Sequence, residues 1–196
     1  NRVCIWVNND LNESTLPCGT HNVLSSGRKI VKPYFDFFNY SGIQRSVYLV
    51  MLPAESIQDY EVSYTLDGAD AQVDYKVFCE GAGEISVQLL DAENKLVAEA
   101  NGAESALCVQ NAHLWQVRNA YLYTIVITLK KDGLPVDEYR ERIGIRTVEI
   151  RGTKILINGK SVYLKGFGKH EDFDILGRGF NWAVAKRDFE CMKWTD

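Results

Sequence analysis

The sequence predicts a mainly β protein in which an immunoglobulin-like β-sandwich lies between the end of another sandwich and the opening of a (β/α) barrel. Short segments of alternating apolar and polar residues recur between about residues 57 and 150, and this spacing is typical of a β-sandwich. An Asn-Gly pair at 158–159 lies between two apolar runs, and an amphipathic helical pattern follows it.

The first segment, residues 1–53, is predicted to be the end of a sandwich. Val3 to Val7 and Ser46 to Met51 have the composition of strands, and the stretch from Asn8 to Lys32 between them is predicted to be a long polar loop. Two or three strands cannot bury a core alone, so we expect further strands of this sandwich outside the sequence. Pro53 marks the predicted boundary.

The middle segment, residues 54–148, is predicted to be the immunoglobulin-like sandwich. About seven strands fit into it, as in that fold, and glycine-containing turns separate them. We expect nearly all of its aromatic side chains to lie in the core. The predicted strands include residues 60–66, 73–77, 85–89, 107–109, 121–129 and 139–145.

The last segment, residues 149–196, is predicted to open a barrel. Lys154 to Ile157 and Lys160 to Leu164 flank Asn158-Gly159, which tolerates the positive φ of a type I′ hairpin turn. A glycine-rich polar loop follows, and then Trp182, Ala185, Phe189 and Met192 fall at helical spacing, which predicts a helix with a buried apolar face. In (β/α) barrels the loop after a strand faces the active site.

That loop, Gly166 to Asp174, holds one imidazole and three carboxylates within residues 170–174. Its glycines are expected to let the backbone turn sharply after the strand. Polar loops on rigid scaffolds often carry function, but a solvated turn is the commoner fate of charged residues. Glu171 has no partner carboxylate at a defined distance, so the residues alone assign no acid or base.

Composition excludes several classes of partner. With 46% apolar and 11% aromatic residues the chain is globular, and no apolar run is long enough to cross a bilayer. A net charge of -4 without a basic stripe argues against nucleic acid. Five cysteines without a C-x-x-C pair favour a reducing compartment. No spacing resembles a calcium loop, so neither a metal nor a cofactor is predicted.

Five blocks of the sequence carry a resemblance to a known family. They are Asn9 to Asn12, Tyr34 to Arg45, Asn111 to Trp115, Ile143 to Arg146 and Gly166 to Phe180. In this order and at these separations they resemble glycoside hydrolase family 2, and within it the β-glucuronidases. The resemblance covers essentially the whole chain.

The resemblance implies an architecture that agrees with the patterns above. Residues 1–53 would be the C-terminal part of a jelly-roll sugar-binding domain, residues 54–148 the immunoglobulin-like domain, and residues 149–196 the beginning of a (β/α)8 TIM barrel. It also implies a homotetramer for the complete enzyme. Family members are retaining glycosidases that use two glutamates. Both glutamates would lie beyond Asp196, so no catalytic residue is expected in this chain, and the isolated chain is expected to be inactive.

Three residues match substrate-pocket positions of the family. Asp36 matches an aspartate that accepts hydrogen bonds from sugar hydroxyls, although from the residues alone it is more simply a turn residue held by Asn39 and Ser41. His170 matches a histidine that contacts the sugar, while a neutral histidine bonded to backbone is its alternative role. Asp172 belongs to the same block and would contact the substrate or fix the tautomer of His170.

Other functions and compartments stay open at this point. A family 2 β-galactosidase or β-mannosidase is the nearest alternative, because the residues that would read the C6 carboxylate of a glucuronide lie outside the chain. A non-catalytic sandwich that binds carbohydrate or protein explains the middle segment, but it does not explain why a polar loop and a helix follow. The bacterial cytoplasm is the favoured compartment, with a lysosomal or secreted enzyme as the alternative.

Overall fold

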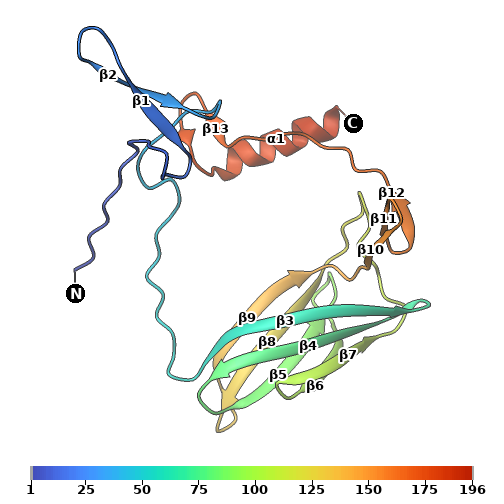
Figure 1. Ribbon diagram of the computed structural model, residues 1–196. Helices are drawn as coiled ribbons and strands as arrows, with labels where there is room; N and C mark the ends of the chain where they lie inside the picture. The colour runs from blue at the N-terminus through green and yellow to red at the C-terminus, as the bar shows by residue number, and fades with distance from the viewer. Residues whose placement is uncertain (1, 196) are drawn as a thin grey trace. The chain divides into compact units, whose positions relative to one another are not determined.

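The computed structural model describes residues 2–195 (Figure 1). The chain divides into two compact units, one formed by residues 50–165 and the other by residues 1–49 together with 166–196. Strands make up most of the regular structure, which confirms the mainly β fold class. The domain bounds 1–53, 54–148 and 149–196 stay a prediction, because compact units are defined by contacts and need not coincide with domains.

A two-layered sandwich forms most of the 50–165 unit (Figure 1). One sheet has the strand order β3-β4-β7 and the other the order β6-β5-β8-β9, with antiparallel pairing throughout. These sheets confirm the predicted immunoglobulin-like sandwich of about seven strands. The strands are β3 (Ser56–Asp67), β4 (Asp70–Glu80), β5 (Glu84–Leu90), β6 (Leu96–Asn101), β7 (Glu104–Val109), β8 (Tyr123–Lys131) and β9 (Leu134–Ile143).

The core of the sandwich follows from the alternation in the sequence. Successive side chains of a strand point to opposite faces of its sheet, so Val73 and Val77 of β4 face the same way and are 0% and 5% exposed. Ile125, Ile127 and Leu129 of β8 face them from the other sheet, and all are at most 1% exposed. Apolar residues at every second position therefore close the two layers on each other.

Two expectations about the sandwich need correction. β6 (Leu96–Asn101) was not predicted, because most of its side chains are exposed and its apolar alternation is weak. The aromatic residues are only partly in the core: Tyr75 and Tyr123 are each 2% exposed, whereas Phe78 and Tyr139 are 39% and 40% exposed. Phe78 lies at a β4 position of the opposite parity, which faces solvent. Tyr139 pairs with Ile127 and packs against the Tyr60 ring, but it lies in β9 at the edge of its sheet, where it is less covered.

Two of the five motif blocks pack against each other at one end of the sandwich. The backbone N–H of Trp115 donates to the carbonyl of Ile145 at 2.9 Å, and the Arg146 guanidinium lies over the indole ring, 5.1 Å from its centroid. A Cβ on Gly144 would come within 2.8 Å of the Trp115 ring. Glycine is therefore required at position 144 by close packing.

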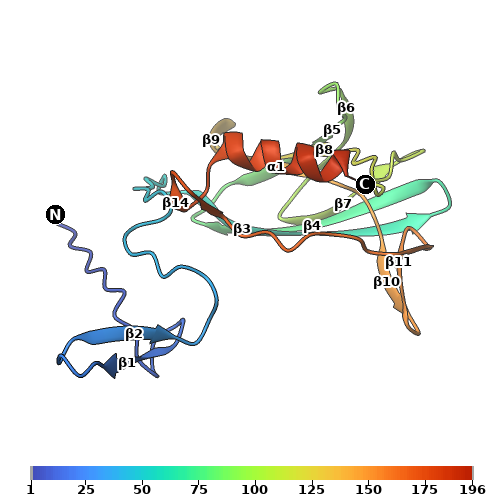
Figure 2. The same ribbon diagram turned by 90° about the horizontal axis from the view of Figure 1, so that it is seen from above.

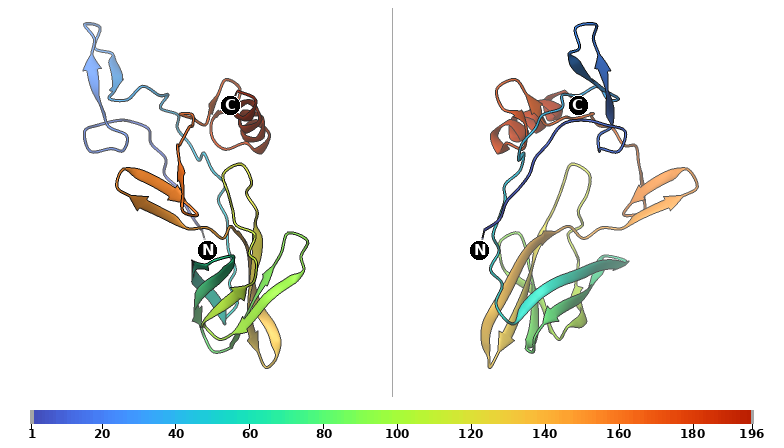
Figure 3. Two further views of the ribbon diagram at one scale, coloured as in Figure 1. Left: turned by 90° about the vertical axis from the view of Figure 1, so that its right-hand side faces the viewer. Right: turned by 60° about the vertical axis from the view of Figure 1, so that its left-hand side comes forward.

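A three-stranded antiparallel sheet follows the sandwich and extends from one end of it (Figure 3). It contains β10 (Val148–Arg151), β11 (Lys154–Ile157) and β12 (Lys160–Val162). Asn158 and Gly159 both have positive φ, 51° and 72°, which confirms the predicted Asn-Gly hairpin turn. The predicted strand from Lys160 to Leu164 ends earlier, because Tyr163 and Leu164 have no pairing partner in the described structure and are 85% and 65% exposed.

Asn158 also fixes this hairpin to the sandwich. Its side-chain oxygen accepts from the backbone N–H of Thr147 at 3.0 Å, and its side-chain nitrogen donates to the carbonyl of Trp115 at 2.9 Å. The turn residue thus connects the hairpin both to the strand connection before β10 and to the loop that carries Trp115.

Replacing Asn158 by alanine is expected to lower the free energy of unfolding of this unit by about 2–3 kcal/mol. The variant leaves two half-buried backbone groups without partners and forces a Cβ-bearing residue without a polar side chain into the left-handed region. Asn94, in the exposed turn before β6, also has positive φ (63°). The matched variant Asn94→Ala should cost about 1 kcal/mol, from the backbone alone. Urea unfolding followed by circular dichroism measures the free energy of unfolding of both variants. Equal losses would contradict a stabilising role of the two Asn158 side-chain hydrogen bonds.

The other unit contains a hairpin of β1 (Gly19–Val23) and β2 (Lys29–Pro33). The sequence instead predicted strands at 3–7 and 46–51 and a loop at 8–32, and these predictions are wrong in the structure. An apolar run forms a strand only beside a partner that accepts and donates its backbone hydrogen bonds. Neither run has such a partner among residues 2–195, and Trp6 and Leu49 are 90% and 94% exposed.

The same unit ends in the helix α1 (Trp182–Trp194), as predicted from its spacing (Figure 2). Asn181 caps its N-terminus, since its side-chain oxygen accepts from the backbone N–H of Val184 at 3.1 Å. Its predicted buried face is wrong: Ala185 is buried, but Trp182 and Phe189 are 80% and 59% exposed, because no described element covers them. No helix within residues 2–195 is long and apolar enough to span a membrane.

Candidate functional site

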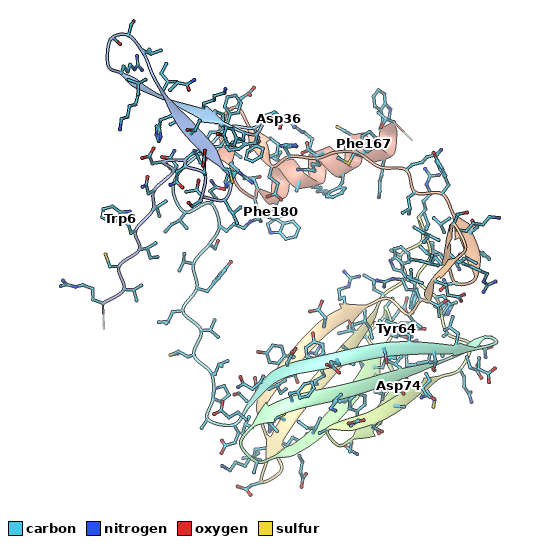
Figure 4. The ribbon with its side chains drawn as sticks, in the orientation of Figure 1. Trp6, Asp36, Tyr64, Asp74, Phe167 and Phe180 are labelled. Atoms are coloured by element: carbon cyan, nitrogen blue, oxygen red, sulfur yellow. The ribbon has the colours of Figure 1, made fainter. Side chains whose placement is uncertain are left out.

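The aromatic block, residues 34–45, forms one side of the candidate site. It leaves β2 as a turn in which the rings of Phe35 and Phe37 stack at 4.2 Å with an interplanar angle of 25°. The stacked rings are half-buried, and Asp36 between them is exposed (Figure 4). An acidic side chain is thus presented to solvent on a turn that its two aromatic neighbours hold in place.

The aromatic block is tied to the segment around residue 9. The side-chain amide of Asn39 donates to the carbonyl of Asn9 at 2.8 Å, and the side-chain amide of Asn9 donates to the carbonyl of Asn39 at 3.2 Å. This reciprocal pair joins two more of the motif blocks. It also means that Asn39 does not hold Asp36, and no hydrogen bond from Asn39 or Ser41 to that carboxylate occurs in the described structure.

The polar loop, residues 166–180, forms the other side. It contains a small hairpin of β13 (Asp172–Phe173) and β14 (Gly177–Arg178). Its sharp turn lies at Gly177, where φ is 62°, and not at Gly166 or Gly168, as the sequence suggested. A Cβ at Gly177 would lie 3.3 Å from the ring of Tyr40, so the hairpin rests against the aromatic block.

Three side-chain contacts join the polar loop to the aromatic block. The rings of His170 and Phe37 lie with centroids 6.4 Å apart, and the Arg178 guanidinium lies 5.2 Å from the centroid of the Phe37 ring. Arg45 forms an ion pair with Glu171. Segments more than 120 residues apart in sequence are therefore neighbours in one compact unit.

The predicted site residues take up clear positions in this arrangement. Asp36 precedes Phe37 in the chain and His170 contacts the Phe37 ring, so both lie beside the same aromatic side chain. The His170 Nδ1 atom is 3.8 Å from an Asp172 carboxylate oxygen, a distance longer than a hydrogen bond. His170 has a 66% exposed side chain, whereas that of Asp172 is 22% exposed.

Asp172 contains a buried oxygen that has no hydrogen-bond partner among the described residues, its Oδ1 atom. A buried acceptor without a partner costs free energy unless a donor reaches it. The other oxygen of the same carboxylate faces His170. This arrangement favours a supporting role for Asp172 behind the imidazole.

The polar loop is also fixed to helix α1. Lys169 Nζ lies 3.3 Å from an Asp188 carboxylate oxygen and 5.5 Å from the centroid of the Phe173 ring. Desolvation raises the pKa of Asp188, but its hydrogen bonds to Arg187 and Lys169 outweigh that effect and hold the pKa below its usual value. Asp188 therefore stays ionised and keeps the residue before His170 attached to the helix.

Sequence reasoning missed the roles of Arg45 and Arg178. Arg45 was visible as the last residue of the aromatic block, but its partner Glu171 lies 126 positions further along the chain. No periodic pattern connects two such residues. Among residues 2–195 no group of three or more His, Cys, Asp or Glu side chains could hold a metal ion.

Two family profiles match the chain, and both describe the same family. Residues 55–146 match the profile of "Glycosyl hydrolases family 2", and residues 148–196 match that of "Glycosyl hydrolases family 2, TIM barrel domain". Together the two profiles cover more than two thirds of the chain. The last segment is therefore the beginning of a TIM barrel, as the strand, loop and helix predicted.

Individual relatives carry one activity in their names. The chain is 42% identical to the β-glucuronidase of Paenibacillus borealis, over 100% of this chain and 34% of that protein. It is 39% identical to the human β-glucuronidase, over 98% of this chain and 32% of that protein. The crystal structure of Ruminococcus gnavus β-glucuronidase is 63% identical, with a TM-score of 0.88 over 96% of this chain and 32% of that one.

The chain therefore spans about a third of the length of the curated relatives it matches. The two profile matches are adjacent and in the order that the strand patterns predict. The five motif blocks fall into two packed clusters, one at the end of the sandwich and one around Phe37. On these grounds the chain belongs to glycosyl hydrolase family 2.

Proposed function

We propose that this chain is a segment of a retaining β-glucuronidase and that it supplies one wall of the sugar pocket. The observation that carries the proposal is the contact between the Phe37 and His170 rings, which brings the aromatic block and the polar loop together. A solved structure of a relative that is 63% identical, the β-glucuronidase of Ruminococcus gnavus, is a complex with D-glucuronic acid. The names of the curated relatives support the same substrate class.

In this proposal Asp36 and His170 bind the sugar and do not perform the bond cleavage. The carboxylate of Asp36 accepts hydrogen bonds from sugar hydroxyls, and hydrogen bonds to carboxylates are short and strong. The exposed imidazole of His170 donates or accepts a further hydrogen bond. The Asp172 carboxylate lies behind the imidazole, 3.8 Å from its Nδ1 atom, and supports it electrostatically.

The cleavage itself is assigned to two glutamates outside this chain. In a retaining glycosidase one carboxylic acid protonates the leaving oxygen, and a second carboxylate attacks the sugar to form a covalent intermediate that water then hydrolyses. The two carboxyl groups must be about 5–5.5 Å apart for this double displacement. Glu171, the glutamate of the polar loop, is engaged by Arg45 instead.

The proposal is tested by a chimera in which residues 1–196 replace the matching segment of the Ruminococcus gnavus enzyme. Identity of 63% over 96% of the chain makes that exchange conservative. We expect the chimera to hydrolyse an aryl β-glucuronide with a kcat/KM within about tenfold of the host enzyme, since each 1.36 kcal/mol of lost transition-state binding costs one factor of ten. The isolated chain should show no turnover above background.

Two results would contradict the proposal. A folded chimera that loses more than about a hundredfold in kcat/KM would mean that this segment does not build a glucuronide pocket. Turnover by the isolated chain would mean that the chemistry lies within it. An aryl β-galactoside and an aryl β-mannoside serve as control substrates, and a preference of the chimera for either would favour the alternative glycosidases.

We further propose a reducing compartment such as the bacterial cytoplasm, and a homotetramer for the complete enzyme. The first is supported by five cysteines that are all free. The second is supported by the family resemblance alone. Light scattering of the purified chimera and of the host enzyme would compare their oligomeric states.

A further inference from the structure

Glu171 is the one carboxylate of residues 170–172 whose role the sugar pocket leaves open. Its side chain is engaged by the guanidinium of Arg45, which also lies over the ring of Phe180 at 5.7 Å from the centroid. Arg45 therefore contacts the polar loop at two places, Glu171 and its last residue, Phe180. A catalytic acid needs a carboxyl group that is free to exchange a proton with the substrate, whereas the Glu171 carboxylate is occupied by Arg45.

The backbone of Glu171 takes part in the same connection. Its carbonyl accepts from the N–H of Gly179 at 3.2 Å, which closes the polar loop across the β13–β14 hairpin. A Cβ at Gly179 would lie 3.1 Å from the carbonyl oxygen of Gln44, the neighbour of Arg45. The side chain of Glu171 thus contacts Arg45, and its backbone bonds to Gly179, which lies close to the neighbouring residue Gln44.

The exposure of the pair argues against a role in stability. The side chains of Arg45 and Glu171 are 64% and 37% exposed, and exposed ion pairs contribute little to the free energy of folding. The pair can nevertheless fix the position of its neighbours, because Glu171 lies between His170 and Asp172 in sequence. A small displacement of Glu171 moves the imidazole and its supporting carboxylate together.

We propose that Arg45 and Glu171 are a positioning pair that holds His170 of the polar loop in register with Asp36 of the aromatic block. The inference rests on the proposed function for its consequence, which is sugar binding. Its structural part, the fixing of the loop, stands independently. The pair does not exchange protons with the substrate.

The test is a double-mutant cycle in the chimera. Arg45→Gln and Glu171→Gln are each expected to raise KM for an aryl glucuronide about tenfold, with kcat changed less than about twofold, because a misplaced binding residue weakens ground state and transition state alike. The double variant should show the same loss of about tenfold and not the product of the two, since the residues act through each other. Arg45→Lys keeps the charge and should restore most of the affinity.

The matched control is Glu138→Gln in β9. Glu138 forms an exposed ion pair with Arg140 at 3.0 Å in the sandwich, with side-chain exposures of 45% and 57%. This variant should leave both kinetic constants unchanged. It separates the loss of an exposed arginine–glutamate pair in general from the loss of this one.

A second readout does not depend on activity. Hydrogen exchange measured by mass spectrometry should show amides of the polar loop, including that of Gly179, exchanging about tenfold faster in both single variants, because local opening exposes them. If the chimera itself were inactive, the proposed function would fail, while the exchange measurement would still decide the positioning role.

Three results would overturn the positioning role. The first is unchanged KM and unchanged exchange in the single variants. The second is an additive loss of about a hundredfold in the double variant, which indicates independent residues. The third is a Glu171→Gln variant that loses kcat at constant KM, because that pattern belongs to a group acting in the chemical step.

Discussion

Replacing Asp36 by alanine in the chimera is expected to lower kcat/KM for an aryl glucuronide by about a hundredfold. A hydrogen bond to a charged group is worth about 1.5–3 kcal/mol, and each 1.36 kcal/mol corresponds to a factor of about ten. The carboxylate is exposed beside the Phe35–Phe37 stack, so its removal leaves no cavity and should not affect folding. Steady-state kinetics and a thermal unfolding curve measure the two effects separately.

The control for this variant is Asp67→Ala, at the exposed end of β3 in the sandwich. It removes an equivalent charge and should leave kcat/KM unchanged. Asp36→Asn keeps an acceptor without the charge and should lie between the wild type and alanine. A loss below about threefold for Asp36→Ala would indicate that this aspartate is a turn residue only, since such a loss is under about 0.7 kcal/mol.

The largest effect on stability is expected from Ile125→Ala, at the centre of β8. Ile125 is 0% exposed and lies in the core between the two sheets. Truncating a fully buried isoleucine removes its apolar contacts and leaves a cavity, which costs about 2–5 kcal/mol. Urea unfolding followed by far-ultraviolet circular dichroism should show the sandwich transition at a clearly lower midpoint.

Ile150→Ala is the matched control, because the same side chain is removed at a position that is 81% exposed in β10. It should change the free energy of unfolding by less than about 0.5 kcal/mol. Similar losses at both positions would mean that the sandwich core does not determine the stability of this unit.

The sandwich could be predicted because the alternation of apolar and polar residues within each strand identifies the face that is buried. Val73 and Val77 alternate with polar residues, and the same alternation gives the buried face of β5. The Asn158-Gly159 turn and the helical spacing of α1 were equally local signals. Each of these features depends on residues only a few positions apart, which is the range over which a sequence pattern is direct.

The errors arose where a local pattern needed a distant partner. Residues 3–7 and 46–51 are as apolar as strands, yet they form none, since no described strand offers them hydrogen bonds. The apolar face of α1 likewise has the correct spacing but no element over it, so Trp182 stays exposed. A strand needs a second segment to pair with, and a buried helix face needs a second segment to cover it. The pattern of one segment cannot show whether that partner is present.

The sequence alone determined the fold class, the hairpin, the helix and, through its motif blocks, the candidate residues Asp36, His170 and Asp172. Only the tertiary structure decided that Phe37 lies against His170 and that Glu171 is held by Arg45. The physical reason is that contacts between residues more than 120 positions apart depend on how the whole chain folds back on itself, which no local periodicity encodes.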